Sequence, residues 1–221
     1  MCNILEIDSI QKNYGHKSVL SDVFLQCRTG EIIGILGRNG SGKSTLLQIV
    51  SGLISADFKR ITINKLLKNT NSKICQDISY LSQDNFIPKH FSVKTAIQLS
   101  IDKNNIQTFL EDNLINSIID NKINQLSGGE LRYLEIKLVL ENNKKFALLD
   151  EPYNGLSPVA IEKINTLILQ NKAKKGIIIT DHNYKNVIEI STDLYLMKAG
   201  ALSKIKSTED LVFHGYLNSI L

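Results

Sequence analysis

The residues best suited to chemistry form a glycine-rich stretch, 37–45, with the sequence Gly-Arg-Asn-Gly-Ser-Gly-Lys-Ser-Thr. It matches the P-loop pattern, in which glycines allow successive backbone N–H groups to point at one concave site. The helix expected to follow adds partial positive charge, so a phosphate is favoured there. The alternative, a glycine turn with an unrelated lysine, is disfavoured by the apolar strand predicted before the loop and the helix predicted after it. The residues predicted to bind a nucleoside triphosphate in this loop are Gly37, Asn39, Gly40, Ser41, Gly42, Lys43, Ser44 and Thr45.

Two carboxylates near residue 150 supply the second part of the predicted chemistry. Asp150 follows four apolar residues (146–149), an arrangement whose carboxylate holds Mg²⁺, directly or through water. We expect the Ser44 hydroxyl to coordinate the same ion and Lys43 to reach the β- and γ-phosphates. Glu151 comes next, and a carboxylate beside the γ-phosphate can polarise or deprotonate the attacking water. A strand-end turn with helix-capping acids is the alternative for Asp150 and Glu151.

The elements that must position these groups are buried strands. Residues 32–36, 146–149 and 176–180 are continuous apolar runs typical of strands in a parallel sheet. An α/β sheet binds ligands at the edge where the carboxyl ends of its strands meet. His182 follows the last of these runs, so its imidazole is predicted to contact the γ-phosphate and orient the water. The alternative is a polar residue satisfied by its neighbours.

The rest of the chain is predicted to form two further parts. The chain begins with antiparallel strands at 4–8 and 19–25, instead of the alternating strand–helix order of a doubly wound fold. Tyr14 is expected in the turn between them, either as a plate on which a base stacks or as an ordinary surface tyrosine. Residues 64–76 are predicted to be a loop, and residues 84–140 an inserted helical lobe.

Composition narrows the class of protein. The 221 residues suggest one domain, and 43% hydrophobic with 22% charged residues is ordinary for a soluble globule. The net charge of +4 is spread along the chain without a like-charge run, so no nucleic-acid partner is expected. The scattered cysteines Cys2, Cys27 and Cys75 fit a reducing cytosol. No apolar run is long enough to span a membrane, so any membrane part would have to come from another chain.

A further motif identifies the family that the sequence resembles. Residues 126–130, Leu-Ser-Gly-Gly-Glu, open a predicted helix and resemble the signature motif of ABC ATPases, the nucleotide-binding subunits of ABC transporters. The resemblance covers nearly the whole chain, with the motifs in the family's order. It implies that Tyr14 stacks on adenine, that Gln83 is the glutamine that binds nucleotide and Mg²⁺, that Glu151 is the catalytic base, and that His182 is the switch histidine. An N-cap serine followed by flexible glycines is the alternative at the signature motif.

The resemblance also implies a fold and an assembly. The fold is α/β, a P-loop NTPase core of ABC ATPase type with an antiparallel β subdomain and an inserted helical subdomain. The whole chain, 1–221, forms one such domain, with 1–83 and 141–221 as the nucleotide-binding core and 84–140 as the helical lobe. Two subunits, identical or related, would sandwich two ATP molecules head to tail. Residues predicted to complete the partner's ATP site are Ser127, Gly128 and Gly129.

The predicted function is that of an ATP-hydrolysing subunit of a multi-chain ABC transporter, with ATP and Mg²⁺ as cofactors. Separate transmembrane permease subunits would hold it at the cytoplasmic, inner face of the cell membrane. Within the family, residues 151–158 and 179–183 most resemble ATPases of branched-chain amino acid uptake and lipopolysaccharide export. A soluble ABC-type ATPase that drives a non-membrane assembly is the first alternative, and a P-loop kinase or another NTPase is the second.

Two features depart from the family pattern. Ser157 stands where the D-loop usually has aspartate, which keeps a helix cap but removes a charge that could act across the dimer interface. The stretch between Gln83 and the signature motif is short, which implies a trimmed helical lobe and an unusual shape for the membrane partner.

Overall fold

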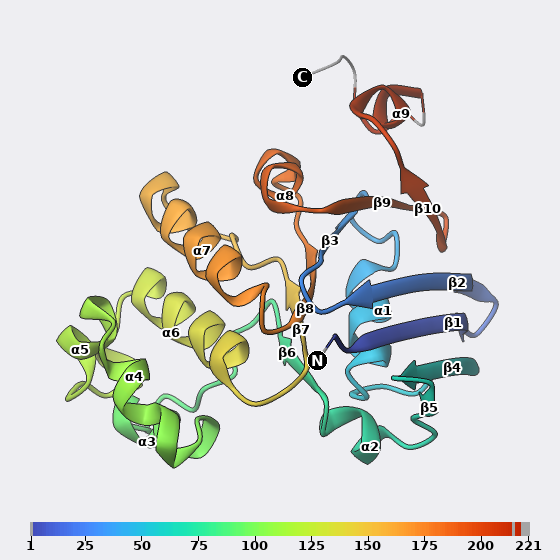
Figure 1. Ribbon diagram of the computed structural model, residues 1–221. Coiled ribbons are helices and arrows are strands. Elements are labelled where there is room, and N and C mark those ends of the chain that lie inside the picture. Colours follow the sequence, from blue (N-terminus) through green and yellow to red (C-terminus); the bar gives the residue numbers. More distant parts are fainter. Residues whose placement is uncertain (1, 214, 218–221) are drawn as a thin grey trace.

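The computed structural model describes residues 2–213 and 215–217 of the chain. Its main sheet has the strand order β10-β9-β3-β8-β7-β6, and every neighbouring pair except β9 and β10 is parallel (Figure 1). The prediction that residues 32–36, 146–149 and 176–180 form strands of one parallel sheet is therefore confirmed. The sheet also contains the hairpin of β9 and β10, in which β9 pairs with the P-loop strand β3. Its strands are β3 (Ile32–Leu36), β6 (Ile78–Leu81), β7 (Phe146–Asp150), β8 (Gly176–Thr180), β9 (Asp193–Lys198) and β10 (Ala201–Ile205).

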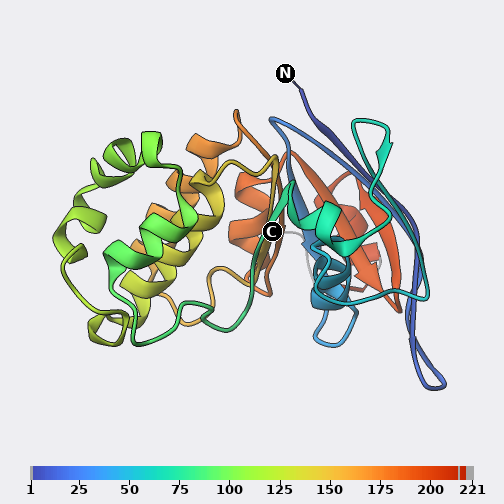
Figure 2. The ribbon, with the colours of Figure 1, turned by 90° about the horizontal axis from the view of Figure 1, so that it is seen from below.

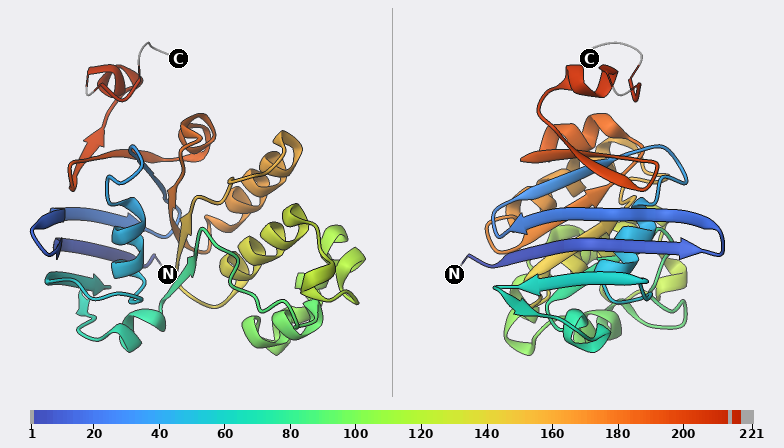
Figure 3. Two further views of the ribbon diagram at one scale, coloured as in Figure 1. Left: turned by 180° about the vertical axis from the view of Figure 1, so that it is seen from behind. Right: turned by 90° about the vertical axis from the view of Figure 1, so that its right-hand side faces the viewer.

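A second sheet is antiparallel and has the order β2-β1-β4-β5, as expected for the start of the chain. Figure 3 shows β1, β2 and β4 side by side in its right-hand view. The first two strands are longer than predicted, because Ser9 (φ 52°) and Asp22 (φ 53°) take the left-handed conformation and allow bulges within the ladder. The strands are β1 (Ile4–Tyr14), β2 (Lys17–Arg28), β4 (Phe58–Ile63) and β5 (Leu66–Leu67).

Two sequence-based expectations about this region are wrong in detail. Tyr14 is the last residue of β1, paired with Lys17, and not a turn residue. The predicted loop 64–76 contains β5 and a short helix, α2 (Asn71–Cys75). Local hydrogen bonds explain the helix, because the Thr70 side chain accepts a hydrogen bond from the Lys73 N–H and so caps it.

Two layers of apolar side chains surround the main sheet. Helix α1 (Lys43–Val50) shares one buried cluster with both sheets, through side chains such as Leu46 and Ile49. The other face of the main sheet is covered mainly by α6 (Gly128–Glu141), α7 (Pro158–Asn171) and α8 (Tyr184–Ile190), with α9 (Thr208–Phe213) farther along the chain (Figure 1). The P-loop strand β3 is therefore buried on both faces.

A third apolar cluster lies entirely between residues 87 and 138. It is built from α6 and from three shorter helices, α3 (Val93–Ser100), α4 (Ile106–Leu110) and α5 (Asn113–Ile118), which gather at the end of the molecule away from β1 and β2 (Figure 2). Ser92 caps α3 by accepting a hydrogen bond from Thr95 N–H at 3.0 Å. The division of the chain at 84 and 140 stays a prediction, and residues 1, 214 and 218–221 of the predicted domain lie outside the described residues. Within residues 2–213 and 215–217, no helix has the length and apolar character needed to cross a membrane.

Candidate functional site

The loop between β3 and α1 forms a concave backbone surface. Gly42 has φ 108°, and a Cβ atom there would lie 2.9 Å from the Val19 carbonyl oxygen, so only glycine fits this close approach. Helix α1 starts directly after Gly42, with no side-chain cap and no acid in its first turn. The N–H groups of this first turn therefore lack a side-chain acceptor, which suits them to an anion.

Lys43 is the buried cation of this loop, with only 5% of its surface exposed. Its Nζ donates hydrogen bonds to the carbonyl oxygens of Gly37, at 2.7 Å, and Arg38, at 3.3 Å. Burial lowers the pKa of Lys43, although the carboxylates of Glu151 and Asp150 oppose this effect. The ammonium group thus holds the loop in its curled form and lies where a phosphate would gain a charge-assisted hydrogen bond.

A cavity of about 450 Å³ opens beside the loop, within the range of small-ligand sites. Tyr14 reaches it from β1 with 53% of its surface exposed, and Lys12 Nζ lies 4.9 Å from the centroid of its ring. Most of the predicted nucleotide-binding residues meet here. The lining residues are Tyr14, Lys17, Val19, Asn39, Gly40, Ser41, Gly42, Lys43, Ser44, Thr45, Gln83 and Glu151.

Asp150 is completely buried and does not line the cavity itself, but it contacts Ser44, which does. Its Oδ1 accepts hydrogen bonds from Ser44 Oγ at 3.1 Å and from Thr180 Oγ1 at 2.7 Å, and its Oδ2 accepts one from Tyr80 OH at 3.0 Å. Gln83 Nε2 donates to Ser44 Oγ at 2.9 Å, so the three predicted metal-binding residues form one connected group. A carboxylate, a hydroxyl and an amide supply the oxygen ligands that Mg²⁺ prefers, so this donor set fits the ion.

Sequence reasoning missed Thr180 and Tyr80. Both side chains orient the Asp150 carboxylate, and both come from strands that flank β7, with Thr180 directly opposite Asp150 in the ladder. The signal was present at Thr180, because a polar residue ends an otherwise apolar strand beside the predicted Mg²⁺ ligand. Asp181, also missed, is fully buried and accepts the N–H groups of Tyr153 and Asn183; burial raises its pKa.

Glu151 and His182 lie together next to the cavity. The His182 Nδ1 atom is 3.7 Å from Glu151 Oε2 and 3.6 Å from Asp181 Oδ1, with 58% of the imidazole side chain exposed. His182 does not line the cavity, whereas Glu151 does. The Glu151 backbone has φ 46°, a left-handed conformation that costs a non-glycine residue about 1 kcal/mol, and its N–H donates to the Thr180 carbonyl oxygen at 2.8 Å.

The signature motif lies at the start of α6, and its residues do not line the nucleotide cavity. Ser127 caps the helix by accepting from the Glu130 N–H, and its own N–H and hydroxyl donate to Glu130 Oε2 at 2.8 and 2.7 Å. A Cβ atom at Gly128 or Gly129 would meet nothing within 4 Å, so the backbone there is open to a partner. The alternative of an N-cap serine is thus observed, and the partner-binding role stays a prediction. Ser157 caps α7 by accepting a hydrogen bond from the Ala160 N–H at 3.4 Å.

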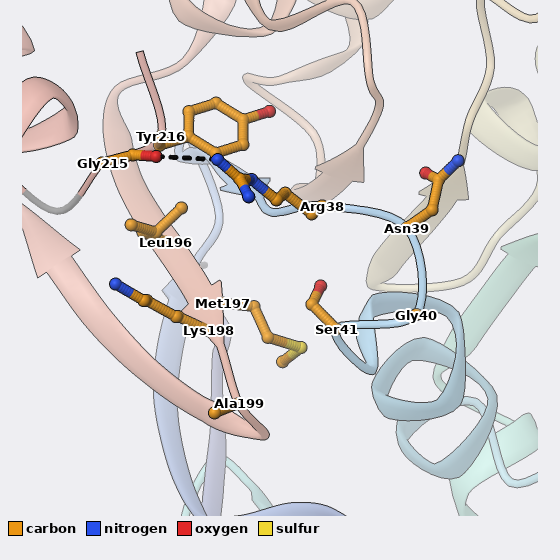
Figure 4. A pocket seen from close by; sticks show the side chains of 10 residues that line it. All are labelled: Arg38, Asn39, Gly40, Ser41, Leu196, Met197, Lys198, Ala199, Gly215 and Tyr216. Carbon is orange, nitrogen blue, oxygen red and sulfur yellow. Dashed lines mark hydrogen bonds between the residues drawn. The ribbon is translucent and has the colours of Figure 1, made fainter. Parts of the chain in front are cut away.

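Another cavity, of about 350 Å³, shares Asn39, Gly40 and Ser41 with the nucleotide cavity (Figure 4). It lies between the P-loop, β9 and the segment at residues 215–216. Arg38 Nη2 donates to the Gly215 carbonyl oxygen at 3.1 Å, so this segment is tied to the loop. Lys43, Ser44 and Glu151 line the first cavity and not this one, so we assign the nucleotide to the first.

Comparisons with known proteins identify the family and the fold. The family described as "ABC transporter" matches residues 20–154. The lipopolysaccharide export system ATP-binding protein LptB of Haemophilus influenzae is 31% identical over 225 residues, covering 95% of this chain and 93% of that protein. LptB of Escherichia coli K12 is 31% identical over 212 residues, covering 90% of this chain and 88% of that protein.

Solved structures share the fold. An ATP-binding subunit of an ABC transporter superposes with a TM-score of 0.85 at 19% identity, covering 98% of this chain and 95% of the other. A nucleotide-free ATP-binding cassette from an ABC transporter gives a TM-score of 0.82 at 24% identity, covering 98% and 96%. At these identities the likeness establishes the fold, and the family match and the relatives establish the family. The chain therefore belongs to the ABC transporter family, as one of its ATP-binding subunits with ATPase activity.

Proposed function

We propose that two copies of this chain, or this chain and a related one, close around two ATP molecules and thereby drive separate transmembrane permease subunits. The observation that supports this proposal is that the predicted ATP-binding residues lie in two separate places on the subunit. One cavity gathers Tyr14, the P-loop, Gln83 and Glu151, whereas the signature motif lies outside it with open backbone. A second subunit that brings its own signature motif to this cavity would complete the site.

Each residue of the cavity has a distinct task in this proposal. Tyr14 stacks on adenine, and the residues from Gly37 to Thr45 surround the triphosphate with backbone N–H groups and the Lys43 ammonium. Ser44, Gln83 and Asp150 would hold Mg²⁺, which neutralises phosphate charge when bound. Thr180 and Tyr80 keep the Asp150 carboxylate oriented through the hydrogen bonds described above.

Glu151 accepts a proton from the water that attacks the γ-phosphate. Its carboxylate lines the cavity, and the left-handed backbone of this residue directs the chain out of β7 at that point. His182, 3.7 Å from that carboxylate, orients the water and contacts the γ-phosphate once the site is closed. An exposed imidazole suits this task, because it is free to turn toward ligand.

The closed dimer binds ATP more tightly than ADP, and this difference in affinity explains why the dimer closes and reopens. ATP is held by the P-loop of one subunit and by Ser127, Gly128 and Gly129 of the other, whereas ADP lacks the γ-phosphate that joins the two halves. Hydrolysis therefore weakens the closed dimer. Ser157 keeps the helix cap of the D-loop but carries no charge, so we propose weaker coupling between the two sites than an aspartate would give.

The relatives named for lipopolysaccharide export favour a transporter over a soluble ABC-type machine. By the same comparison the chain would work at the cytoplasmic, inner face of the cell membrane, held there by its permease partners. Isolation of the tagged full chain from detergent extracts tests this part. We expect a membrane protein to co-purify, and a tight complex containing soluble partners alone would support the non-membrane alternative.

Substitution of the base tests the enzyme mechanism. Glu151→Gln should keep ATP affinity within about twofold, lower turnover about 100-fold and accumulate a dimer that depends on ATP. Turnover is measured as phosphate release and the dimer by analytical ultracentrifugation. Glu162→Gln, on the outer part of α7 and away from the cavity, is the control and should behave as wild type. Unchanged hydrolysis in Glu151→Gln would remove Glu151 as the base.

A further inference from the structure

Arg132 is a buried arginine of α6 that sequence reasoning left unassigned. Only 5% of its side chain is exposed, and its guanidinium donates hydrogen bonds to backbone carbonyl oxygens from two separate segments. Nη1 bonds Ser82 O at 2.8 Å, next to Gln83. Nη2 bonds Asp150 O at 3.1 Å and Glu151 O at 2.9 Å, and Nε bonds Pro152 O at 3.3 Å.

Glu135, one turn farther along α6, completes the group and is fully buried. Its Oε1 accepts the backbone N–H groups of Phe86, at 2.8 Å, and Ile87, at 3.3 Å. Its Oε2 lies 3.6 Å from Arg132 Nη1 and has no hydrogen-bond partner among the described residues. Burial raises the pKa of Glu135, and the two N–H groups and Arg132 oppose this effect. One charge pair thus joins the 86–87 backbone to the end of β7.

Stability alone does not account for this pair. Replacing a buried ion pair with apolar residues is often neutral or even stabilising, because both charges lose their water. The planar, five-donor guanidinium is instead suited to fixing several carbonyl groups at once. Here it fixes the backbone of Glu151, whose left-handed conformation is held from the other side by the Thr180 carbonyl oxygen.

We infer that Arg132 is a positioning residue for Glu151, and that Arg132 and Glu135 together make the placement of this base depend on the segment at residues 82–87. The inference rests on the proposed role of Glu151 as the base. It assigns to α6 a second task besides presenting the signature motif, because the same helix holds the base of its own subunit. A partner that displaces residues 86–87 would pull on Glu135, move Arg132 and so shift the Glu151 carboxylate in the cavity.

The test uses Arg132→Met in the full chain. Turnover should fall at least about tenfold, because a displacement near 1 Å of a reacting group lowers rates by up to about 100-fold. ATP affinity of the isolated subunit should stay within about twofold, since Arg132 does not line the nucleotide cavity. Arg132→Lys keeps the charge without the planar fork and should lose an intermediate amount of turnover.

Lys137→Met is the matched control. Lys137 is a cation of the same helix with 7% of its side chain exposed, and it pairs with Glu141 at 2.6 Å and Asp112 at 3.4 Å, away from the carbonyl groups at the end of β7. Both methionine variants lose a buried ion pair, and thermal unfolding measures what each loses in stability. If Arg132 merely stabilises the fold, then Arg132→Met and Lys137→Met will show the same turnover per folded molecule, and the inference is overturned.

A double-mutant cycle separates this inference from the proposed function. In a Glu151→Gln background there is no base to position, so adding Arg132→Met should change single-turnover hydrolysis less than about twofold. A full tenfold loss in that background would overturn the inference, since Arg132 would then act elsewhere. Wild-type turnover in Glu151→Gln alone would instead overturn the role of Glu151. Glu135→Gln, which can still accept from Phe86 and Ile87, should lose less turnover than Arg132→Met.

Discussion

Two glycine-rich helix starts in this molecule have opposite local chemistry. At α1, the N-terminal turn has no side-chain cap and no acid, and the buried Lys43 lies beside it. At α6, Ser127 and Glu130 form a capping box, so the helix start already holds a carboxylate of its own chain. The hydrogen bonds from Ser127 lower the pKa of Glu130, which keeps that carboxylate charged at neutral pH.

The difference explains why one helix start can bind nucleotide alone and the other cannot. Phosphate at α1 meets unpartnered N–H groups and a cation, whereas phosphate at α6 must compete with Glu130 for the same donors. The start of α6 is also exposed to solvent, where charge interactions are screened. We therefore expect α1 to set the affinity of one subunit for ATP, and α6 to contribute only when a partner brings a phosphate to it.

Lys43→Ala tests the first half of this comparison and has the largest expected effect. Losing one partner of a buried charged hydrogen bond costs about 3 kcal/mol, so ATP affinity of the subunit should fall about 100-fold. Titration with a fluorescent ATP analogue measures it. Lys163→Ala, a lysine of α7 outside the nucleotide cavity, is the control and should bind as wild type. An affinity within twofold of wild type for Lys43→Ala would show that the two helix starts do not differ in this way.

Ser127→Arg tests the second half. The larger side chain fills the space where a partner's phosphate would lie, so turnover should fall about tenfold or more, toward that of the separate subunit. ATP affinity of the isolated subunit should change less than about twofold, because Ser127 is absent from the nucleotide cavity. Ultracentrifugation with Glu151→Gln in the same chain should show that the ATP-dependent dimer is lost. If Ser127→Arg abolishes ATP binding by the monomer instead, the trans arrangement is wrong.

Glu130→Gln tests the comparison of the two helix starts further, because it removes the negative charge at the start of α6 and keeps the size of the side chain. Glutamine can still accept from Ser127, but it no longer repels a phosphate at the helix start. Removing one exposed like charge is worth under about 1 kcal/mol, so the ATP-dependent dimer should become roughly threefold tighter at low salt. Dimer dissociation constants at two salt concentrations measure this effect. A weaker dimer would mean that the Glu130 carboxylate itself contacts the partner favourably.

The smallest expected effect concerns pH. Burial places the pKa of free Lys43 below its ordinary value of 10.5, and only the ammonium form makes a charge-assisted hydrogen bond to phosphate. ATP affinity should therefore fall as pH rises, and reach about half its neutral value where half of free Lys43 is deprotonated. Lys43→Arg, which stays protonated, should show no such fall over the same range. If the ATP affinity of the wild type did not change over this pH range, the pKa of free Lys43 would not be lowered.

The parts of the fold that were predictable from sequence are those specified by local patterns. The apolar runs 32–36 and 176–180 coincide with β3 and β8, and the helix caps Ser92 and Ser157 are of a residue type that favours this position. The full length of β1 was not predictable, because the alternation stops near Ser9, where a bulge lets pairing continue. Helix α2 was missed because its five residues carry no clear apolar period.

The site residues that belong to a known motif could be predicted from the sequence. The residues that only tertiary contacts bring to the site could not. Nothing in the residue type indicates that Arg132 is buried, since a charged residue within a helix is usually solvated. A signal was nonetheless present, because Leu131 and Leu134 surround Arg132 and an acid follows at Glu135, the pattern of a helix buried on most faces with an internal charge pair. Contacts such as Thr180 to Asp150 depend on strand order, which the sequence alone did not define.

The position of β3 between β8 and β9 has a consequence for biosynthesis. Both neighbours come from the last quarter of the chain, so the strand that leads into the P-loop leaves the ribosome long before either of them. Such distant pairings fold slowly, and the apolar residues of β3 are exposed to misassociation in the meantime. The ATP site is therefore one of the last parts of the molecule to form, and a chain truncated before β8 would contain the P-loop sequence without either strand that pairs with β3.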